Sequence, residues 1–499
     1  MPSPFTAKRG GLFVQPGGPN TEPFYLGCHT LADITESEGA IELLRCFNPE
    51  GDGWDVAGNT ISPPDPVTFS IETRMMKTRS WIQRMEFPAS FYVLQSETGR
   101  RDNFKNYDSG MVIADARRSS KTRSGTVAIE EDAASMVSAD FEAYPPVYEL
   151  DEQTVTRQAS VATDVLNDIW MNPDAHDYAS WGSRLYRGSL GIAGGDSAVG
   201  PALATLLFVT EYGDTLTAAG ADPMAAGVDL EATRFFYVGK NTRRYVVSME
   251  APAGAQGLTA YSDDGGAVWT TSNVGGAVAG HGTLNGRALW CPNERFSLLA
   301  SNLGFIYKST DGCVTWVAKE EAGIAATLYA CVHADPTDTY CIAGGPADAI
   351  VLSEDGGESW QVSAAVTGGG GDILCCWRFD ENKMFVGTDD GELWYSRDGG
   401  VSWTEQTRIP GTGVGDVMDM YWNNEHVGWI AKDTAAPVGA ILRTINGGWD
   451  WEVITTPTNA GLNAIMAPTV NLCYAVGNLQ GGTSFIARSK SVGIDLPTA

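Results

Sequence analysis

An eight-residue motif that recurs five times in the second half of the chain constrains the fold more than any other feature. The copies occupy residues 262–269, 309–316, 353–360, 396–403 and 444–451, and their tryptophans follow one another at intervals of 47, 44, 43 and 48 residues. A period in the forties is typical of arrays of small units that stack to bury their apolar faces. Short strand-like segments precede each copy, as at 383–388 and 392–396. The units are therefore predicted to be four-stranded sheets arranged radially, as in a β-propeller.

The residue types of the motif predict a tight turn that needs no ligand. Each copy opens with a hydroxyl residue: Ser262, Ser309, Ser353, Ser396 and Thr444. A side chain that can accept backbone N–H groups follows, namely Asp264, Asp311, Asp355, Asp398 and Asn446. A positive φ is expected next, at Gly266, Gly357, Gly400 and Gly448, with Cys313 in this place in the second copy, where a different or mildly strained turn is predicted. The copies close with Trp269, Trp316, Trp360, Trp403 and Trp451, expected to pack as apolar plugs between units.

The motif, Ser/Thr-x-Asp-x-Gly-x-x-Trp, resembles the Asp-box or BNR repeat of sialidases, sortilin-like receptors and photosystem assembly factors. Three copies match it strictly and two are altered. The resemblance implies a propeller in which each box lies on the hairpin between the third and fourth strands of a blade, away from the active face. We therefore expect these residues to be structural, with no catalytic role, no metal and no cofactor.

Strand pairs before each box predict blades at roughly 232–272, 285–320, 326–364, 372–407 and 416–455. A sixth unit, at 472–489, has inner strands but no box after it, so the propeller needs a strand from elsewhere to close its open edge. The segment 204–210 is the expected donor. The sequence predicts six blades, or seven if 181–215 contains a degenerate blade.

Composition restricts the functions that are open to the chain. The formal net charge of −28 disfavours nucleic acid as the main ligand, because phosphate binding needs basic surface. No apolar run approaches the length of a membrane span, and the N-terminus lacks the apolar core of a secretory signal, so synthesis in the cytoplasm is expected. Nine cysteines without a Cys-x-x-Cys pair indicate neither a disulfide framework nor a zinc site. If 334–338 is a hairpin loop, Cys331 and Cys341 lie opposite one another, either bridged or as two buried thiols.

The N-terminal half contains no copy of the repeated motif and is predicted to be a β-rich domain with one or two helices. Strands are expected at 40–47, 66–74, 91–95, 126–130 and 147–150, and a helix at 161–170, where apolar residues recur at helical spacing. The expected domains are 1–180, a Gly/Pro/Ala-rich connection at 181–230 that holds the closing strand, and the propeller at 231–499. Residues 18–73 resemble tail-tube and related virion proteins of tailed phages in layout, with an opening arm, a strand, a Gly-Asp-Gly-Trp loop and a second strand. That resemblance implies ring-stacking self-assembly, with an appended domain projecting outward.

A basic segment within this half contains Arg117, Arg118, Lys121 and Arg123 and is predicted to be a mobile loop. Such a loop is either simply solvated or docks on an acidic surface, for which a neighbouring copy of the same protein is one candidate; contact with nucleic acid is a third and weaker reading. Together these features predict a virion tail protein that self-assembles, contacts other virion proteins and displays its propeller, which could hold host-surface glycans or proteins. The alternative is a free carbohydrate- or protein-binding propeller, with the spare tryptophans Trp181, Trp290, Trp377, Trp422 and Trp429 available for binding. Glycosidase activity is not expected, because Arg408-Ile-Pro410 lies after the fourth box and not in the first blade, where the sialidase motif occurs.

Overall fold

The computed structural model resolves the chain into two compact units, Met1–Glu152 and Gln153–Ala499. It describes residues 10–16, 21, 23–27, 30–35, 41–47, 54–61, 67–73, 88–95, 109–124, 136–143, 147–151, 153–157, 164–171, 191–197, 204–210, 215–218, 229–238, 242–250, 259–275, 286–301, 305–319, 331–364, 366, 371–410, 415–433, 439–454, 461–480 and 483–491. Every regular element among these residues is a β-strand. The division at 152/153 lies earlier in the chain than the expected boundary near 180.

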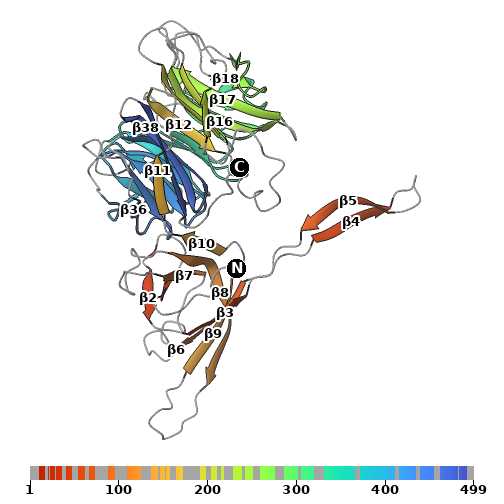
Figure 1. Cartoon of the computed structure of the whole chain (residues 1–499), viewed down its shortest axis with the longest axis vertical. Helices are drawn as coiled ribbons and strands as arrows, with labels where there is room; N and C mark the ends of the chain where they lie inside the picture. Colours follow the sequence, from red (N-terminus) through yellow and green to blue (C-terminus); the bar gives the residue numbers. More distant parts are fainter. Residues whose placement is uncertain are drawn as a thin grey trace. The chain divides into compact units, whose positions relative to one another are not determined.

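The N-terminal unit is built on one eight-stranded sheet. Its order is β2-β1-β7-β8-β9-β6-β3, with β10 paired to β8, and β4 and β5 form a separate hairpin (Figure 1). The strands are β1 Gly10–Pro16, β2 Phe24–Gly27, β3 Thr30–Thr35, β4 Ile41–Phe47, β5 Trp54–Ile61, β6 Val67–Thr73, β7 Ala89–Gln95, β8 Ser109–Ser124, β9 Met136–Ala143 and β10 Val147–Asp151. Three phenylalanines of β6, β7 and β9 (Phe69, Phe91 and Phe141) pack together with ring centroids 4.9–5.2 Å apart. The expected strands at 40–47, 66–74, 91–95 and 147–150 are confirmed by β4, β6, β7 and β10, whereas 126–130 lies outside the described residues.

The basic segment is a strand, so its prediction as a mobile loop is wrong. Arg117, Arg118, Lys121 and Arg123 belong to β8, whose second half pairs antiparallel with β9, for example Arg117 with Glu142 and Arg123 with Val137. The basic segment was predicted to be a loop because it has no periodic apolar residues. Strand β8 pairs with β9 through backbone groups, and such pairing does not require apolar side chains at alternate positions.

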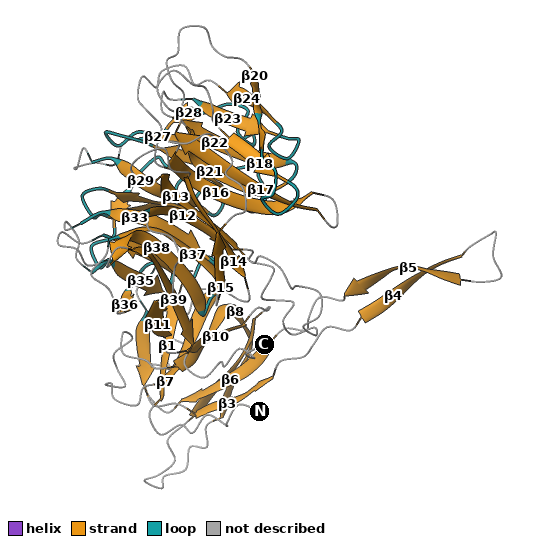
Figure 2. Cartoon of the chain, turned by 45° about the horizontal axis from the view of Figure 1, so that its top comes forward, coloured by secondary structure: helices purple, strands orange, loops and turns teal. Residues whose placement is uncertain are grey.

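The second unit is a propeller of seven blades among the described strands (Figure 2). Blades 1 to 4 are β12–β15, β16–β19, β21–β24 with β20 added at the edge, and β25–β28; blades 5 to 7 are β29–β32, β33–β36, and β37–β39 with β11. The bounds are β11 Gln153–Arg157, β12 Leu166–Met171, β13 Gly191–Ser197, β14 Ala204–Thr210, β15 Thr215–Ala218, β16 Asp229–Val238, β17 Thr242–Glu250, β18 Thr259–Ser262, β19 Thr270–Thr271, β20 Asn273–Gly275, β21 Gly286–Asn293, β22 Phe296–Ser301, β23 Ile306–Ser309, β24 Thr315–Lys319, β25 Cys331–Ala334, β26 Cys341–Gly344, β27 Ile350–Ser353, β28 Gln361–Val362, β29 Ile373–Arg378, β30 Met384–Thr388, β31 Leu393–Ser396, β32 Thr404–Glu405, β33 Val417–Trp422, β34 Gly428–Lys432, β35 Ala440–Thr444, β36 Glu452–Ile454, β37 Leu462–Thr469, β38 Leu472–Gln480 and β39 Thr483–Ser491.

The closing strand is β11 and not the segment 204–210. β11 pairs antiparallel with β39 over five residue pairs and completes the last blade, so the two ends of the propeller are joined by backbone hydrogen bonds. Residues 204–210 form β14, which lies between β13 and β15 inside blade 1. The degenerate blade allowed for at 181–215 therefore exists, and seven is the blade count of the described strands.

The expected helix at 161–170 is also wrong, because β12 occupies its second half. Leu166, Ile169 and Trp170 have helical spacing in the sequence, but a β-bulge lies between Leu166 and Asp168. A bulge adds one residue to a strand and shifts the side-chain alternation by one position. All three apolar side chains are buried in the core around blade 1.

Candidate functional site

The five copies of the motif form one turn with nearly constant hydrogen-bond geometry. In every copy the hydroxyl donates to the Asp or Asn Oδ1, at 2.8–3.1 Å, and accepts the N–H group four residues on. In all five copies the same Oδ1 also accepts, at 2.9 Å, the backbone N–H four residues after its own residue, from Val268, Thr315, Ser359, Ser402 and Asp450. The prediction of a self-contained turn is therefore confirmed in its local bonds.

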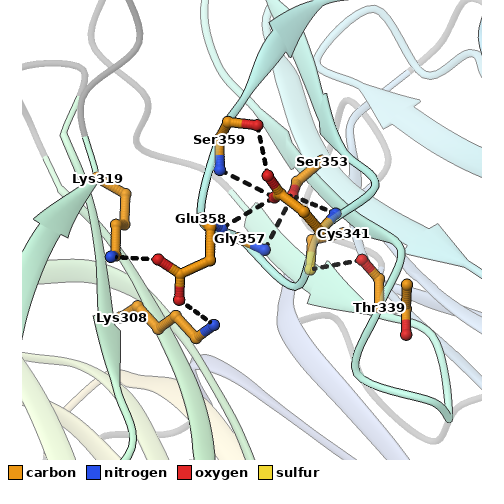
Figure 3. A network of polar contacts seen from close by, with 9 residues as sticks. Lys308, Lys319, Thr339, Cys341, Ser353, Gly357, Glu358 and Ser359 are labelled. Carbon is orange, nitrogen blue, oxygen red and sulfur yellow. Dashed lines mark hydrogen bonds and ion pairs between the residues drawn. The ribbon is translucent and has the colours of Figure 1, made fainter.

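The third copy shows what these bonds do to the carboxylate (Figure 3). Burial raises the pKa of Asp355, but the hydroxyl and N–H of Ser359 and the hydroxyl of Ser353 bond to the ionised form and lower it to about 2. The adjacent Glu358 reaches across to Lys308 and Lys319 of blade 3, with Oε–Nζ distances of 2.6 and 2.5 Å. At Cys313 the φ of 66° lies close to the 77–83° of the equivalent glycines, so this turn keeps the same form with a strained non-glycine residue.

The tryptophans that close the motif pack between neighbouring blades, as predicted. Trp316 is fully buried with Phe236 and Val246 of blade 2 and with residues of blade 3. Trp360, Trp403 and Trp451 fill the corresponding clusters between blades 3 and 4, 4 and 5, and 5 and 6. Trp269 is only partly buried and packs against the core around blades 1 and 2.

The repeated turns lie at the opposite end of the propeller from the beginnings of the innermost strands. Neighbouring strands within a blade run antiparallel, so the innermost strand begins where the second ends and the third begins. The motif joins the third and fourth strands and therefore lies at the other end. We call these the rim end, where the innermost strands begin, and the turn end, where the motifs lie.

The innermost strands of the seven blades contain equivalent segments of up to five residues, which line a central channel. We call this recurring segment the inner-strand pattern. The segments are 166–170, 230–234, 286–290, 373–377, 417–421 and 462–466, with 331–333 of β25 supplying the last three positions in blade 4. In the six complete segments a β-bulge falls between the first and third positions. Positions two to five of these strands enclose a cavity of about 130 Å³. The described parts of these strands thus place equivalent positions of the different blades around one channel.

The layer nearest the rim end is polar and ties the blades together. Asn167 donates to the carbonyl of Leu230, and Asn463 donates to the carbonyl of Leu166. Asp168 accepts the N–H of Thr233 and forms an ion pair with Arg234. These bonds make the polar layer part of the packing between blades 7, 1 and 2.

A second ion pair and a further carboxylate complete this layer. Arg287 pairs with Glu231 at 2.7 Å. Asp419 accepts the N–H groups of Met420 and Ile465, both at 2.8 Å, and forms no ion pair among the described residues. Burial raises the pKa of Asp419 to about 7, with a contribution from Asp168, against the opposing effect of these backbone bonds and Arg234.

The fifth position of the pattern forms an aromatic layer deeper in the channel. Trp170, Trp290, Trp377 and Tyr421 make a closed ring of contacts, with successive centroids 5.7, 5.8, 5.1 and 6.3 Å apart. His333 lies between Trp290 and Trp377, at 4.2 and 3.9 Å. The aromatic layer therefore forms a floor beneath the polar layer.

His333 is held as a neutral imidazole. Burial, together with the charge of Arg234, lowers its pKa well below the usual value. Nδ1 accepts the N–H of Arg378 at 3.1 Å, so the ring proton is on Nε2. The Nε2 atom and Trp290 Nε1 have no hydrogen-bond partner within the described protein, and both are sealed inside the aromatic layer.

Five aspartates, which we call the acidic rim, surround part of the rim end in blades 5 and 6. Asp372 and Asp416 precede the innermost strands β29 and β33, and Asp389, Asp390 and Asp433 follow the second strands β30 and β34. The N–H of Asp389 donates to the carbonyl of Asp372, and that of Asp433 to the carbonyl of Asp416, at 3.0 and 2.9 Å. Burial and then the charges of Asp433, Asp389 and Asp390 raise the pKa of Asp416.

One buried cation lies beneath the acidic rim. Lys432 Nζ donates to the carbonyls of Gly391 and Pro410 at 3.0 and 3.4 Å. Burial lowers the pKa of Lys432 to about 8, against the attraction of Asp416. Its charge offsets part of the negative charge above it.

Several residues singled out from the sequence have a different role in the structure. Cys331 pairs with Gly344, and Cys341 with Ala334, so the two cysteines are not opposite one another and both thiols are free and buried. Of the spare tryptophans, Trp290 and Trp377 line the channel, Trp422 and Trp429 are core residues, and Trp181 lies outside the described residues. No group of His, Cys, Asp and Glu suited to a metal occurs among the described residues. Within the same residues no helix is long and apolar enough to cross a membrane.

Asp168, Glu231, Asp419 and the two asparagines were not recognised as site residues from the sequence. Their signal was the inner-strand pattern, which becomes visible only when the segments are aligned by their distance from the repeated turns. The pattern is short and its residue types differ from blade to blade. Propensity and spacing alone therefore could not mark it.

No protein-family model matches the sequence. A xyloglucanase from Paenibacillus sp is 32% identical over 155 residues, which cover 30% of this chain and 14% of that protein. The photosystem II assembly lipoprotein Ycf48 from Synechococcus sp. (strain CC9902) is 25% identical over 213 residues, covering 40% of this chain and 57% of that protein. The chain thus spans less than two thirds of the length of either relative. A solved structure, YCF48 bound to D1 peptide, has a TM-score of 0.49 and 15% identity, covering 68% of this chain and 97% of that one.

Proposed function

We propose that this chain is a protein-binding β-propeller and that a partner polypeptide docks at its rim end, over the central channel. The observation that carries the proposal is the channel itself, a cavity of about 130 Å³ with a polar wall and an aromatic floor. Concave sites lined by aromatic groups with a few fixed polar side chains are typical of ligand sites. The repeated turns lie at the other end, and their polar groups are engaged in local bonds.

The size of the cavity favours a protein side chain over a sugar. At about 30 Å³ per water molecule, 130 Å³ holds about four waters. An engineered cavity of roughly 150 Å³ binds benzene, so this one admits a single side-chain tip and not an oligosaccharide. The similarity to Ycf48, named as an assembly lipoprotein, supports a role in contacting other proteins.

Glycoside hydrolysis is a weaker proposal. Asp168 and Asp419 both line the cavity, and such reactions use two carboxylates that flank a sugar linkage. However, Asp168 is already bonded to Arg234 and to the N–H of Thr233. The xyloglucanase similarity covers only 14% of that protein.

A matched pair of charge reversals tests the docking surface. Asp390 is exposed on the acidic rim, and Glu354 is exposed at the turn end. Peptides selected from a random display library on the full-length chain should bind Asp390→Lys more weakly than wild type and Glu354→Lys equally well. Failure to enrich any peptide, or equal effects of both substitutions, would contradict docking at the rim end.

Two further predictions from the sequence remain proposals, namely the assignment of the motif to a repeat family and self-assembly of the N-terminal unit. The constant hydrogen bonds of the turns support assignment of the motif to the Asp-box repeats. Self-assembly of the N-terminal unit, as expected for a tail-tube-like virion protein, is tested by sedimentation of the full-length chain across concentration and salt. None of the three similar proteins named above is a virion protein. A strictly monomeric chain, unaffected by reversal of Arg117, Arg118, Lys121 and Arg123 to Glu, would end that hypothesis.

A further inference from the structure

We infer that the group received by the channel is the cationic head of a lysine or arginine side chain, presented by an extended segment of a partner protein. This inference rests on the proposed function and specifies the chemistry of its ligand. The observation that supports it is that the carboxylates of the cavity wall outnumber its guanidinium groups.

The wall has one negative charge more than its cations neutralise. Arg234 is bonded to Asp168 and Arg287 to Glu231, so both guanidinium groups already have carboxylate partners inside the channel. Asp419 is the remaining carboxylate, and no lysine or arginine among the described residues forms an ion pair with it. A half-buried carboxylate that has no ion-pair partner is costly, so a single guest cation would complete the set.

The surroundings of Asp419 would also accommodate the rest of such a side chain. Tyr421 and Trp377 line the same cavity, and aromatic rings attract cations and pack well against the apolar stem of a lysine or arginine. At the opening, the acidic rim favours a positive guest over a negative one. The buried Lys432 is committed to two backbone carbonyls and does not reach Asp419 as an ion-pair partner.

An anionic guest fits this site less well. Three buried N–H donors of cavity-lining residues lack acceptors, namely Arg234 Nε, Trp290 Nε1 and His333 Nε2. All three atoms are buried although their residues line the cavity, so a carboxylate could not reach them without moving the side chains that cover them. It would meet the excess negative charge of the wall first.

Proton linkage provides an independent consequence. The charged and titratable groups around Asp419 are Asp168 on β12, Arg234 on β16 and the buried, neutral thiols of Cys375 and Cys376 on β29. Burial raises the pKa of Asp419 to about 7, so part of the population is protonated at neutral pH. A cation favours the ionised form, so binding should release a proton near pH 7 and strengthen as the pH rises from 6 to 8.

Peptide selection on the full-length chain tests the inference. Enriched peptides that bind Asp390→Lys more weakly than the wild type, and so dock at the rim end, should contain one lysine or arginine. Replacement of that residue by glutamine should weaken binding at least tenfold. Calorimetry in two buffers of different ionisation enthalpy should detect the released proton. Asp419→Asn should reduce the preference for the basic residue to less than threefold, whereas Glu354→Gln, a charge loss at the turn end, should leave it unchanged.

The outcomes separate the two levels of the proposal. Absence of any rim-end peptide would overturn the docking function and this inference together. Rim-end peptides without a basic anchor, or with one that binds without proton release, would overturn the inference and leave the docking function standing. If Asp419→Asn fails to fold in a thermal melt, the glutamine-substituted peptides and the proton measurement on the wild-type chain still decide the question.

Discussion

Trp316 offers a direct test of how the repeated motif stabilises the propeller. Its side chain is fully buried between blades 2 and 3, against Phe236, Val246, Leu299 and Tyr307. Replacement by alanine removes the indole and leaves a cavity that the rigid strands around it can fill only in part. Such truncations cost about 3–5 kcal/mol.

The expected shift of the thermal transition follows from the size of the unit. At about 2.1 cal/mol/K per residue, a unit of roughly 350 residues has an unfolding entropy of about 0.7 kcal/mol/K, so Trp316→Ala should lower Tm by about 4–7 °C. Trp269→Ala is the matched control, because Trp269 closes the same motif but is only partly buried. Its Tm should fall less. Differential scanning calorimetry on the full-length chain compares the two, and equal shifts, or no shift for Trp316→Ala, would refute the assignment of stability to inter-blade burial.

Three other predictions follow from the structure. Burial lowers the pKa of Lys432 to about 8, so between about pH 8 and 10.4 the unfolded state binds more protons than the folded one. The free energy of unfolding, measured by urea titration, should therefore rise with pH in this window. Lys432→Met should make that rise smaller. A chain that begins at Asp164 lacks β11 and exposes the edge of β39, so it should melt lower and aggregate more than one that begins at Gln153; identical behaviour would exclude the closing role of β11. Asn446 Nδ2 donates to the Asp450 carboxylate, whereas Ser402 and Ser359 donate to the aspartates of their own copies. Asn446→Asp would place two carboxylates face to face and should lower the free energy of unfolding by about 1–3 kcal/mol. Asp450→Ser in the same chain should restore most of that loss, as a double-mutant cycle in denaturant would show.

The sequence by itself determined the features that depend on neighbouring residues. The hydroxyl, Asp or Asn and Gly of each motif close their bonds within a few residues, so the turn could be derived without knowing what surrounds it. The spacing of the tryptophans then indicated a repeated unit and, with it, the propeller. Cys313 illustrates the limit of this reasoning, because the sequence left open whether its turn would differ, and the structure shows the same turn with a strained residue.

Tertiary structure alone decided the features that join distant segments. β11 pairs with β39 across more than three hundred residues, and nothing in either strand marks the other as its partner. β12 looked helical because a bulge displaced its apolar residues from strand alternation. The channel combines one short segment from each of seven blades, and each side chain there is unremarkable in its own strand. The negative charge of the cavity and the raised pKa of Asp419 arise only when these segments converge, because burial and the balance of charges are properties of the assembled ring.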